Sequence, residues 1–247
     1  MPRRRLWLCA DDYGISPAVS RGIRDLIARR RLNATSVMVT APFRPVSATY
    51  RPVDQDGAFL SLARTFILGL RQRLDPAALA AEAEAQLAAF QAAFGRPPDF
   101  VDGHQHVQVL PQVSDAVLPA MQRMAPRAWI RQCGRAIPPW RGWGDPKGLL
   151  LDRLSARLRK RCARSGVPTN PAFAGTYDFR RAAAFGALFE SFLQNLPDGG
   201  LVMCHPGFVD AELERLDDFT TMREQEHAFL AGGEFPALLA AHGMELA

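Results

Sequence analysis

The stretch Leu6–Gly14, with the sequence LWLCADDYG, decides most of what can be inferred about the fold. A continuous apolar run from Leu6 to Ala10 is followed at once by Asp11 and Asp12, and then by a glycine. A short apolar run that ends in polar residues is typical of a buried parallel strand. The two carboxylates predict that this strand opens into a polar site.

Two later segments repeat this arrangement with histidine. Residues 102–106 read DGHQH after an apolar pair, and residues 204–207 read CHPG after the apolar run 201–203. If the chain is extended after Val101, the side chains of Asp102, His104 and His106 point the same way. Carboxylate and imidazole at this spacing suit a divalent metal, or the carboxylate orients a ligating histidine from behind.

Each candidate residue also has a structural interpretation. Asp11 and Asp12 could satisfy free amides at the start of the next helix. Two adjacent carboxylates exceed what capping needs, however, and they repel each other unless a cation lies nearby. With a metal present, one carboxylate can bind it while the other takes a proton from the bound water.

His205 could be packed in the core or hydrogen-bonded to a loop. Its ordinary pKa range equally suits a general acid that protonates a leaving amine. Arg131, which closes the run 128–130, is either a surface charge or a partner for a carboxylate or oxyanion. His227 and His242 lie in helical patterns and are interpreted as structural.

Strands and helices alternate along the chain. Ser16 and Pro17 predict a capped helix that runs to about Arg31. The length of 247 residues suits one α/β barrel or two small domains. The alternation of strands and helices, with polar residues after the strands, favours a TIM-like (β/α) barrel. A doubly wound open sheet is the alternative, although no GxGxxG or Walker motif supports it. Further helices are predicted at 76–94, 113–124, 147–164, 181–196 and 235–242, and further strands at 36–39, 100–102, 128–131 and 201–204.

The stretch 40–75 does not follow this pattern. It contains three prolines, little periodicity and one weak apolar run at 59–70. A connection of this length is either functional or indicates that an element is absent.

Composition narrows the class of protein. The chain has 48% hydrophobic and 22% charged residues, which is ordinary for a globular protein. The apolar run after the basic N-terminus is too short for a secretory signal, so we expect a cytoplasmic protein. The four cysteines form no CxxC pair, so neither a zinc cluster nor a disulfide framework is expected.

The net charge is +5, and part of the excess lies in the arginine-rich segment 149–164. This segment is predicted to form a basic amphipathic helix, which could lie against an anionic membrane surface as a peripheral contact at the inner membrane. The favoured interpretation is a solvated arginine-rich face over a core-facing leucine stripe. A nucleic acid partner is not expected, because no binding motif accompanies the charge.

These motifs together resemble the YdjC-like carbohydrate deacetylases, a family that includes chitooligosaccharide deacetylase and the hopanoid-associated HpnK branch. The resemblance covers nearly the whole length and rests on ADDYG at 10–14, RPP at 96–98, VDGHQHV at 101–107, IR at 130–131 and MCHPG at 203–207.

The resemblance implies a single domain over residues 1–247 folded as an irregular TIM-like (β/α) barrel. It also implies a hydrolase that removes N-acetyl groups from amino sugars with one divalent metal, Mg²⁺ or Zn²⁺. It implies that Asp12 and His104 bind the metal, that Asp11 is the general base and that His205 is the general acid. Asp102, His106 and Arg131 would line the site or lie just behind it. The substrate would be an N-acetylated sugar or glycolipid, hopanoid-linked in the HpnK branch, and a homodimer is left open.

The chain departs from the family pattern after the second strand. The family has a Gly-x-His-x-x-Leu-Thr segment there, whose histidine is a metal ligand, whereas this chain has no histidine before His104. The unpatterned stretch 40–75 agrees with the loss of one βα element. Two alternatives to an active deacetylase therefore stay open: a catalytically impaired member that binds a sugar or partner, and a different metal-assisted hydrolase on the same barrel.

Overall fold

The computed structural model describes residues 3–40, 43–136, 145–178 and 184–247. The chain divides into two compact units, which are described one at a time. The first unit comprises residues 1–38, 135–138 and 170–247, and the second comprises 39–134 and 139–169. The predicted single domain and the predicted irregular TIM-like (β/α) barrel concern both units together and stay predictions.

A parallel sheet forms the centre of the first unit. Its central strand β1 (Arg4–Tyr13) pairs with β6 (Gly200–Cys204) on one edge, and β5 (Phe173–Ala174) lies beyond β6. On its other edge β1 pairs with β2 (Ala34–Val37) and, nearer its start, with β7 (Met244–Leu246). Every one of these pairings is parallel, so the predicted mixed α/β class with a parallel sheet is confirmed.

Burial explains why β1 is central. Leu6, Leu8, Cys9 and Ala10 are fully buried, as expected for a strand covered on both faces. The next element, α1 (Pro17–Ala28), begins as predicted: the Ser16 side chain accepts a hydrogen bond from the amide of Val19, and Pro17 occupies the first turn. The helix ends at Ala28, three residues before the predicted end.

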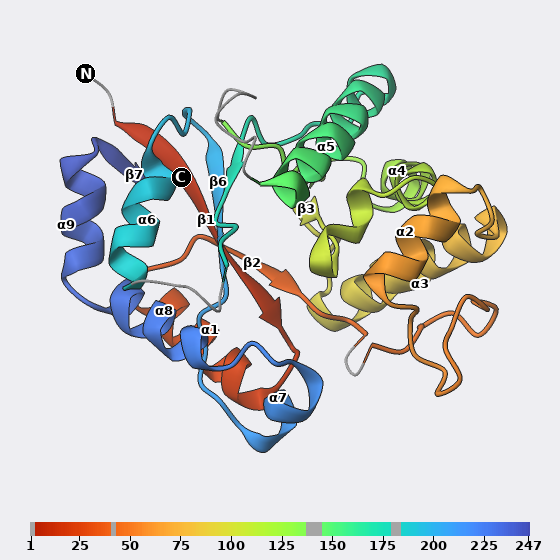
Figure 1. Cartoon of the computed structure of the whole chain (residues 1–247), viewed down its shortest axis with the longest axis horizontal. Coiled ribbons are helices and arrows are strands. Elements are labelled where there is room, and N and C mark those ends of the chain that lie inside the picture. The colour runs from red at the N-terminus through yellow and green to blue at the C-terminus, as the bar shows by residue number, and fades with distance from the viewer. Residues whose placement is uncertain (1–2, 41–42, 137–144, 179–183) are drawn as a thin grey trace. The chain divides into compact units, whose positions relative to one another are not determined.

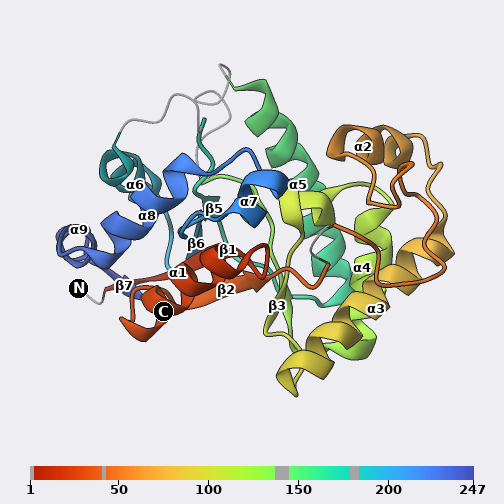
Figure 2. The same cartoon turned by 90° about the horizontal axis from the view of Figure 1, so that it is seen from below.

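Helices α6 (Phe185–Leu193), α8 (Thr221–Ala231) and α9 (Glu234–Ala241) lie side by side along this sheet (Figures 1 and 2). A short helix, α7 (Ala211–Leu216), precedes α8. Phenylalanine rings hold the three longer helices together at centroid separations of 5.5–6.1 Å. The rings belong to Phe185, Phe189, Phe229 and Phe235.

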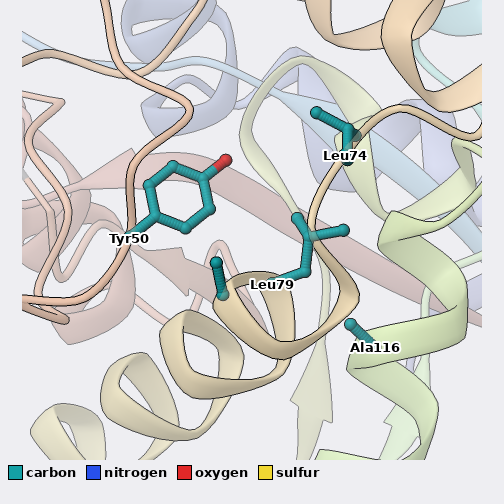
Figure 3. Packing of buried hydrophobic residues seen from close by; sticks show 5 residues of the cluster. Tyr50, Leu74, Leu79 and Ala116 are labelled. Atoms are coloured by element: carbon teal, nitrogen blue, oxygen red, sulfur yellow. The ribbon is translucent and has the colours of Figure 1, made fainter.

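The second unit contains the short parallel pair β3 (Phe100–Val101) and β4 (Trp129–Ile130). Its helices are α2 (Leu62–Leu70), α3 (Pro76–Phe94), the 3₁₀ helix η1 (His104–Val109), α4 (Val113–Met124) and α5 (Pro146–Ser165). A buried cluster joins the segment before α2 to α3 and α4, and four of its members are labelled in Figure 3. They are Tyr50, Leu74, Leu79 and Ala116.

Three of the predicted helices agree closely with the structure. Helices α3 and α4 have the predicted bounds, and α5 extends the prediction by one residue at each end. Helix α2 forms from the weak apolar run inside the unpatterned stretch 40–75. Six described elements were not predicted with their bounds, namely α2, η1, β5, α7, α8 and β7, although the sequence indicates a helical pattern around His227, in α8. The predicted helix at 181–196 begins outside the described residues and is seen as α6. None of the described helices is long and apolar enough to cross a membrane.

Candidate active site

Two predicted site residues occupy matching positions at one edge of the sheet in the first unit. Ala10 and Cys204 are the last aligned pair between β1 and β6, so Asp11 and His205 come next on neighbouring parallel strands. Adjacent strands lie about 4.8 Å apart, and the carboxyl ends of parallel strands share one edge. Asp11 and His205 therefore lie beside each other in the first unit.

Asp11 is half-buried, and its carboxylate is oriented by its neighbours. The hydroxyl of Ser36, on β2, donates a hydrogen bond to Asp11 Oδ1 at 2.9 Å. The Cys9 thiol donates to the same oxygen at 3.5 Å. One carboxylate oxygen of Asp11 is therefore held by the sheet itself.

Asp12 faces a different set of groups. It has a φ of 70°, and the register between β1 and β2 shifts between Ala10 and Tyr13. The bulge turns Asp12 away from the regular alternation of the strand. Its buried carboxylate Oδ2 accepts a hydrogen bond from Nη2 of Arg223, on α8, at 2.7 Å.

Arg223 is completely buried, and it also holds the loop that precedes α8. Its Nη2 atom contacts Asp217 Oδ2 at 2.7 Å, and its Nε atom donates to the carbonyl of Phe219 at 2.9 Å. A buried charge is tolerated when it is paired and hydrogen-bonded in this way. Arg223 thus supplies positive charge beside Asp12.

His205 is held through its backbone by a second residue of α8. Its amide donates a hydrogen bond to Glu226 Oε2 at 2.5 Å, and the hydroxyl of Tyr177 donates to Glu226 Oε1 at 2.5 Å. The imidazole packs edge-on against Phe219, with ring centroids 5.4 Å apart. Burial raises the pKa of Glu226 above its usual range, although His205, Tyr177 and Arg223 act in the opposite direction. Burial, with Glu226 next in effect, also raises the pKa of Tyr177.

Neither Arg223 nor Glu226 was predicted as a site residue. They stand three positions apart on α8, where the sequence indicated only a helical pattern around His227, in a segment with charged residues at 212, 214, 215, 217, 218, 223, 224 and 226. A charged segment of this kind resembles a solvated surface. The one usable signal is that Met222 and Leu230 place an apolar face beside them, which is an i, i+8 relation on a helix.

In the second unit, Asp102 and Arg131 form an ion pair. Arg131 Nη2 lies 2.7 Å from Asp102 Oδ2, with side-chain exposures of 1% and 15%. The amide of Arg131 donates to the carbonyl of Val101, which places both charged residues at the ends of β3 and β4. Of the two interpretations of Arg131, the partner of a carboxylate is confirmed.

The expectation of an extended chain at His104 and His106 is wrong. The segment turns into η1, with Gln105 and His106 at φ values of 52° and 62°. The amide of His106 donates to the carbonyl of Gly103 at 2.8 Å, which closes a tight turn. The side chains of His104 and His106 are therefore not aligned by the alternation of a strand. His104 instead stacks on Phe43, with ring centroids 5.3 Å apart.

The described donors of neither unit by themselves fit a metal centre. Asp12 is paired with Arg223 and Asp102 with Arg131, and no described group of three or more His, Cys, Asp and Glu side chains could hold a metal ion. The four cysteines are buried and not in disulfides. Asp12 belongs to the first unit and His104 to the second, so the binding of one ion by both residues stays a prediction.

Fold and site define a mixed α/β protein with acidic, imidazole and guanidinium groups at the carboxyl ends of parallel strands. A model of the YdjC-like protein family matches residues 5–52 and 44–241. The chain belongs to this family. Its placement in the HpnK branch stays a prediction.

Several known proteins are similar over nearly the whole chain. A Mus musculus protein named carbohydrate deacetylase is 26% identical over 294 residues, covering 99% of this chain and 94% of the relative. A chitooligosaccharide deacetylase of Yersinia pestis (strain Pestoides F) is 26% identical over 260 residues, covering 96% of this chain and 94% of the relative. A crystal structure of a candidate cellobiose-phosphate cleavage protein from Enterococcus faecalis V583 has a TM-score of 0.74 at 18% identity, covering 99% of this chain and 97% of that one. The last similarity concerns the fold alone.

The lengths of the alignments bear on the predicted loss of an element after β2. The alignments run over 294 and 260 positions although the chain has 247 residues, so both relatives contain segments that have no counterpart here. The family match itself falls into two parts that overlap at 44–52, inside the stretch 40–75. The predicted loss of an element after β2 stays a prediction.

Proposed function

We propose that this protein is a carbohydrate deacetylase that removes N-acetyl groups from amino sugars. The observation that carries the proposal is the adjacent placement of Asp11 and His205 at the ends of β1 and β6. A base and an acid are what amide hydrolysis needs, and two relatives over nearly the full length are named deacetylases. The irregular barrel remains part of the proposal.

The chemistry assigns one role to each residue. Asp11, already oriented by Ser36, takes a proton from the attacking water as the water oxygen bonds to the acetyl carbon. The bond between that carbon and the sugar nitrogen then breaks. His205 gives its proton to the departing amine, and acetate leaves.

Arg223 and Arg131 contribute charge rather than proton transfer. Arg223 neutralises Asp12 next to Asp11 in the first unit, and Arg131 neutralises Asp102 in the second. Opposite charge at this range keeps a carboxylate ionised. Metal dependence, with Asp12 and His104 as ligands, is proposed from the family resemblance alone; when bound, a divalent ion would activate the attacking water.

The experiment measures acetate released by the full chain from N-acetylglucosamine oligomers. We expect release that stops with a chelator and returns when Mg²⁺ or Zn²⁺ is added. His205→Gln should lower kcat by about 10²–10⁴-fold, the usual worth of a general acid. His242→Gln is the matched control, because His242 follows α9 as its C-cap residue and its imidazole contacts Glu190, on α6. Equal rates in the two variants would remove His205 from the reaction.

A second candidate function rests on the predicted loss of an element in the stretch 40–75. Phe43, which follows β2 closely in sequence, stacks on His104, and the next residues are held by Glu82, whose carboxylate accepts from the amides of Val46 and Ser47 at 3.0 and 2.7 Å. A family member that lacks the Gly-x-His segment could bind a sugar without hydrolysing it. Calorimetric binding of the same oligomers with no acetate release under any metal condition would select this alternative.

We further propose a peripheral contact with an anionic membrane through α5. Arg153, Arg157, Lys160 and Arg164 are exposed on this helix, while Leu158 is buried. Leu158 therefore packs inward as the favoured interpretation predicts, whereas Leu150 is 44% exposed, so the leucine stripe faces the core only in part. The cationic side alone would meet lipid headgroups, by attraction rather than by insertion.

A further inference from the structure

Helix α8 carries two charged residues that are both fully buried. Arg223 and Glu226 have no exposed surface, and residues three apart lie on the same face of a helix. A buried charge is costly unless it is paired and hydrogen-bonded. The partners of Arg223 and Glu226 therefore explain why their charges are tolerated in the interior.

Glu226 joins two segments that are distant in sequence. One carboxyl oxygen accepts the amide of His205, and the other accepts the hydroxyl of Tyr177, each at 2.5 Å. His205 is the first residue after β6, so this amide determines how the chain leaves the sheet. Two residues further on, the amide of Gly207 donates to the backbone carbonyl of Arg223 at 3.1 Å.

The close packing around this loop leaves it little freedom. A Cβ added to Gly207 would lie 3.0 Å from the Cα of Val19, on α1. A Cβ added to Gly22 would lie 2.8 Å from the Cα of Gly207. The loop after β6 therefore packs closely against α1. It is hydrogen-bonded to α8 through the amides of His205 and Gly207.

We propose that Glu226 is a positioning residue for His205, which it holds at the end of β6 by its backbone amide while Tyr177 holds Glu226. The proposal rests on the proposed function for the role of His205 as the general acid. A displacement of about 1 Å in such a group can lower a rate by about 10²-fold. Glu226 touches no reacting atom in this arrangement and acts only through His205.

Glu226→Gln is the informative substitution. Glutamine has nearly the same shape but one acceptor oxygen instead of two, so it can accept from His205 or from Tyr177 but not from both. Glu224→Gln is the matched control, because Glu224 lies on the same helix and is exposed. Tyr177→Phe removes one of the two bonds to Glu226 and serves as a milder second variant.

The test combines two measurements on the full chain. In ¹⁵N-labelled protein, the His205 amide proton should resonate far downfield, as in a short hydrogen bond to carboxyl oxygen. It should move upfield in Glu226→Gln and stay unchanged in Glu224→Gln. In the acetate-release assay with N-acetylglucosamine oligomers, Glu226→Gln should lower kcat by about 10²-fold with KM unchanged, and Tyr177→Phe should lower it less.

The outcomes separate the two proposals. An unchanged His205 amide and an unchanged kcat in Glu226→Gln would overturn the positioning role. A lower kcat with an unmoved amide would also overturn it, since Glu226 would then act by another route. If the wild-type protein releases no acetate, the proposed function fails, and the amide shift alone decides whether Glu226 holds His205. If Glu226→Gln does not fold, the same comparison is made with Tyr177→Phe.

Discussion

Asp12 and Arg223 form an ion pair whose side chains are 6% and 0% exposed. At such a buried site the Arg223 guanidinium both attracts the Asp12 carboxylate and compensates for its poor solvation. Removing it leaves a carboxylate in a poorly solvated place, where an unpaired charge is strongly unfavourable. The pair is therefore expected to matter to stability as well as to the site.

Arg223→Met should lower the free energy of unfolding by about 3–5 kcal/mol, because Asp12 would be left buried without its partner. The double variant Asp12→Asn/Arg223→Met should recover part of this loss, since an amide carries no charge. Urea unfolding of the wild type, both single variants and the double variant measures the coupling. Arg5→Met, which breaks the exposed pair with Asp198, should change stability little. A loss in Arg223→Met no larger than that in Arg5→Met would contradict the expectation.

Glu226 predicts a pH dependence of stability. Its pKa is raised above the usual 4.5, with burial as the largest cause. The folded state then binds the proton more tightly than the unfolded state does. The stabilisation from this group is fully present below the unfolded pKa and is lost as the pH rises through the folded one.

We therefore expect wild-type protein to lose stability relative to Glu226→Gln as the pH rises from 4.5 toward neutral. Urea unfolding of both proteins over this range gives the difference at each pH. Because the glutamine side chain of the variant does not titrate, other groups cancel in the comparison to the extent that they are unaffected. A difference that grows in favour of the wild type with rising pH would mean that the pKa is lowered.

At the scale of elements, strand β1 is completed by a side chain. Along one edge β1 pairs with β7 near Leu6 and with β2 from Cys9 onward. Between these strands, Asn33 Oδ1 accepts the amide of Leu8 at 2.8 Å, and Asn33 Nδ2 donates to the carbonyl of Leu6 at 2.9 Å. The Asn33 amide thus replaces a missing stretch of backbone partner.

Asn33→Ala should lower the free energy of unfolding by about 1–3 kcal/mol, because the buried amide of Leu8 would lose its partner. The carbonyl of Leu6 would keep its hydrogen bond from the amide of Ala247. Thermal or urea unfolding measures this loss. Gln91→Ala, on the exposed side of α3, is a control that deletes an amide of similar chemistry. Equal stability of the two variants would show that water or a shift of β7 replaces Asn33.

The elements also show where local patterns sufficed. Helix α3 has Asp75 as its N-cap, Pro76 in its first turn and Gly95 in the left-handed conformation at its end, so both bounds were predictable from the sequence. The bounds of helix α8 were not predicted because its inward face carries Arg223 and Glu226, which breaks the apolar period. The turn at His104 was missed because a hydrogen bond from His106 to Gly103 competes with the extended chain.

At the scale of the whole molecule, the net charge of +5 is unevenly distributed. Helix α5 alone exposes Arg153, Arg157, Lys160 and Arg164. Each such cation near an anionic lipid surface contributes about 1 kcal/mol. A stripe of four is enough for reversible adsorption at low salt, when screening is weak.

The full chain should therefore bind vesicles that contain phosphatidylserine and not neutral phosphatidylcholine vesicles, in a cosedimentation assay at low salt. Arg157→Ala/Lys160→Ala should weaken binding by about 2 kcal/mol, or roughly 30-fold. Arg71→Ala/Arg73→Ala removes the same charge from exposed positions outside α5 and should weaken it less. Equal losses in the two double variants would indicate net charge rather than the α5 surface.

The sequence by itself determined the parallel α/β class, the family and the two strand ends that carry Asp11 and His205. These follow from apolar runs, caps and short motifs, which are local properties of the chain. Only the tertiary structure decided what surrounds those residues. Asp12 meets Arg223 across 211 positions, and Glu226 meets Tyr177 across 49. Whether a charged residue is buried or exposed depends on the partner that it contacts in the folded protein. The periodicity of the sequence does not indicate that partner.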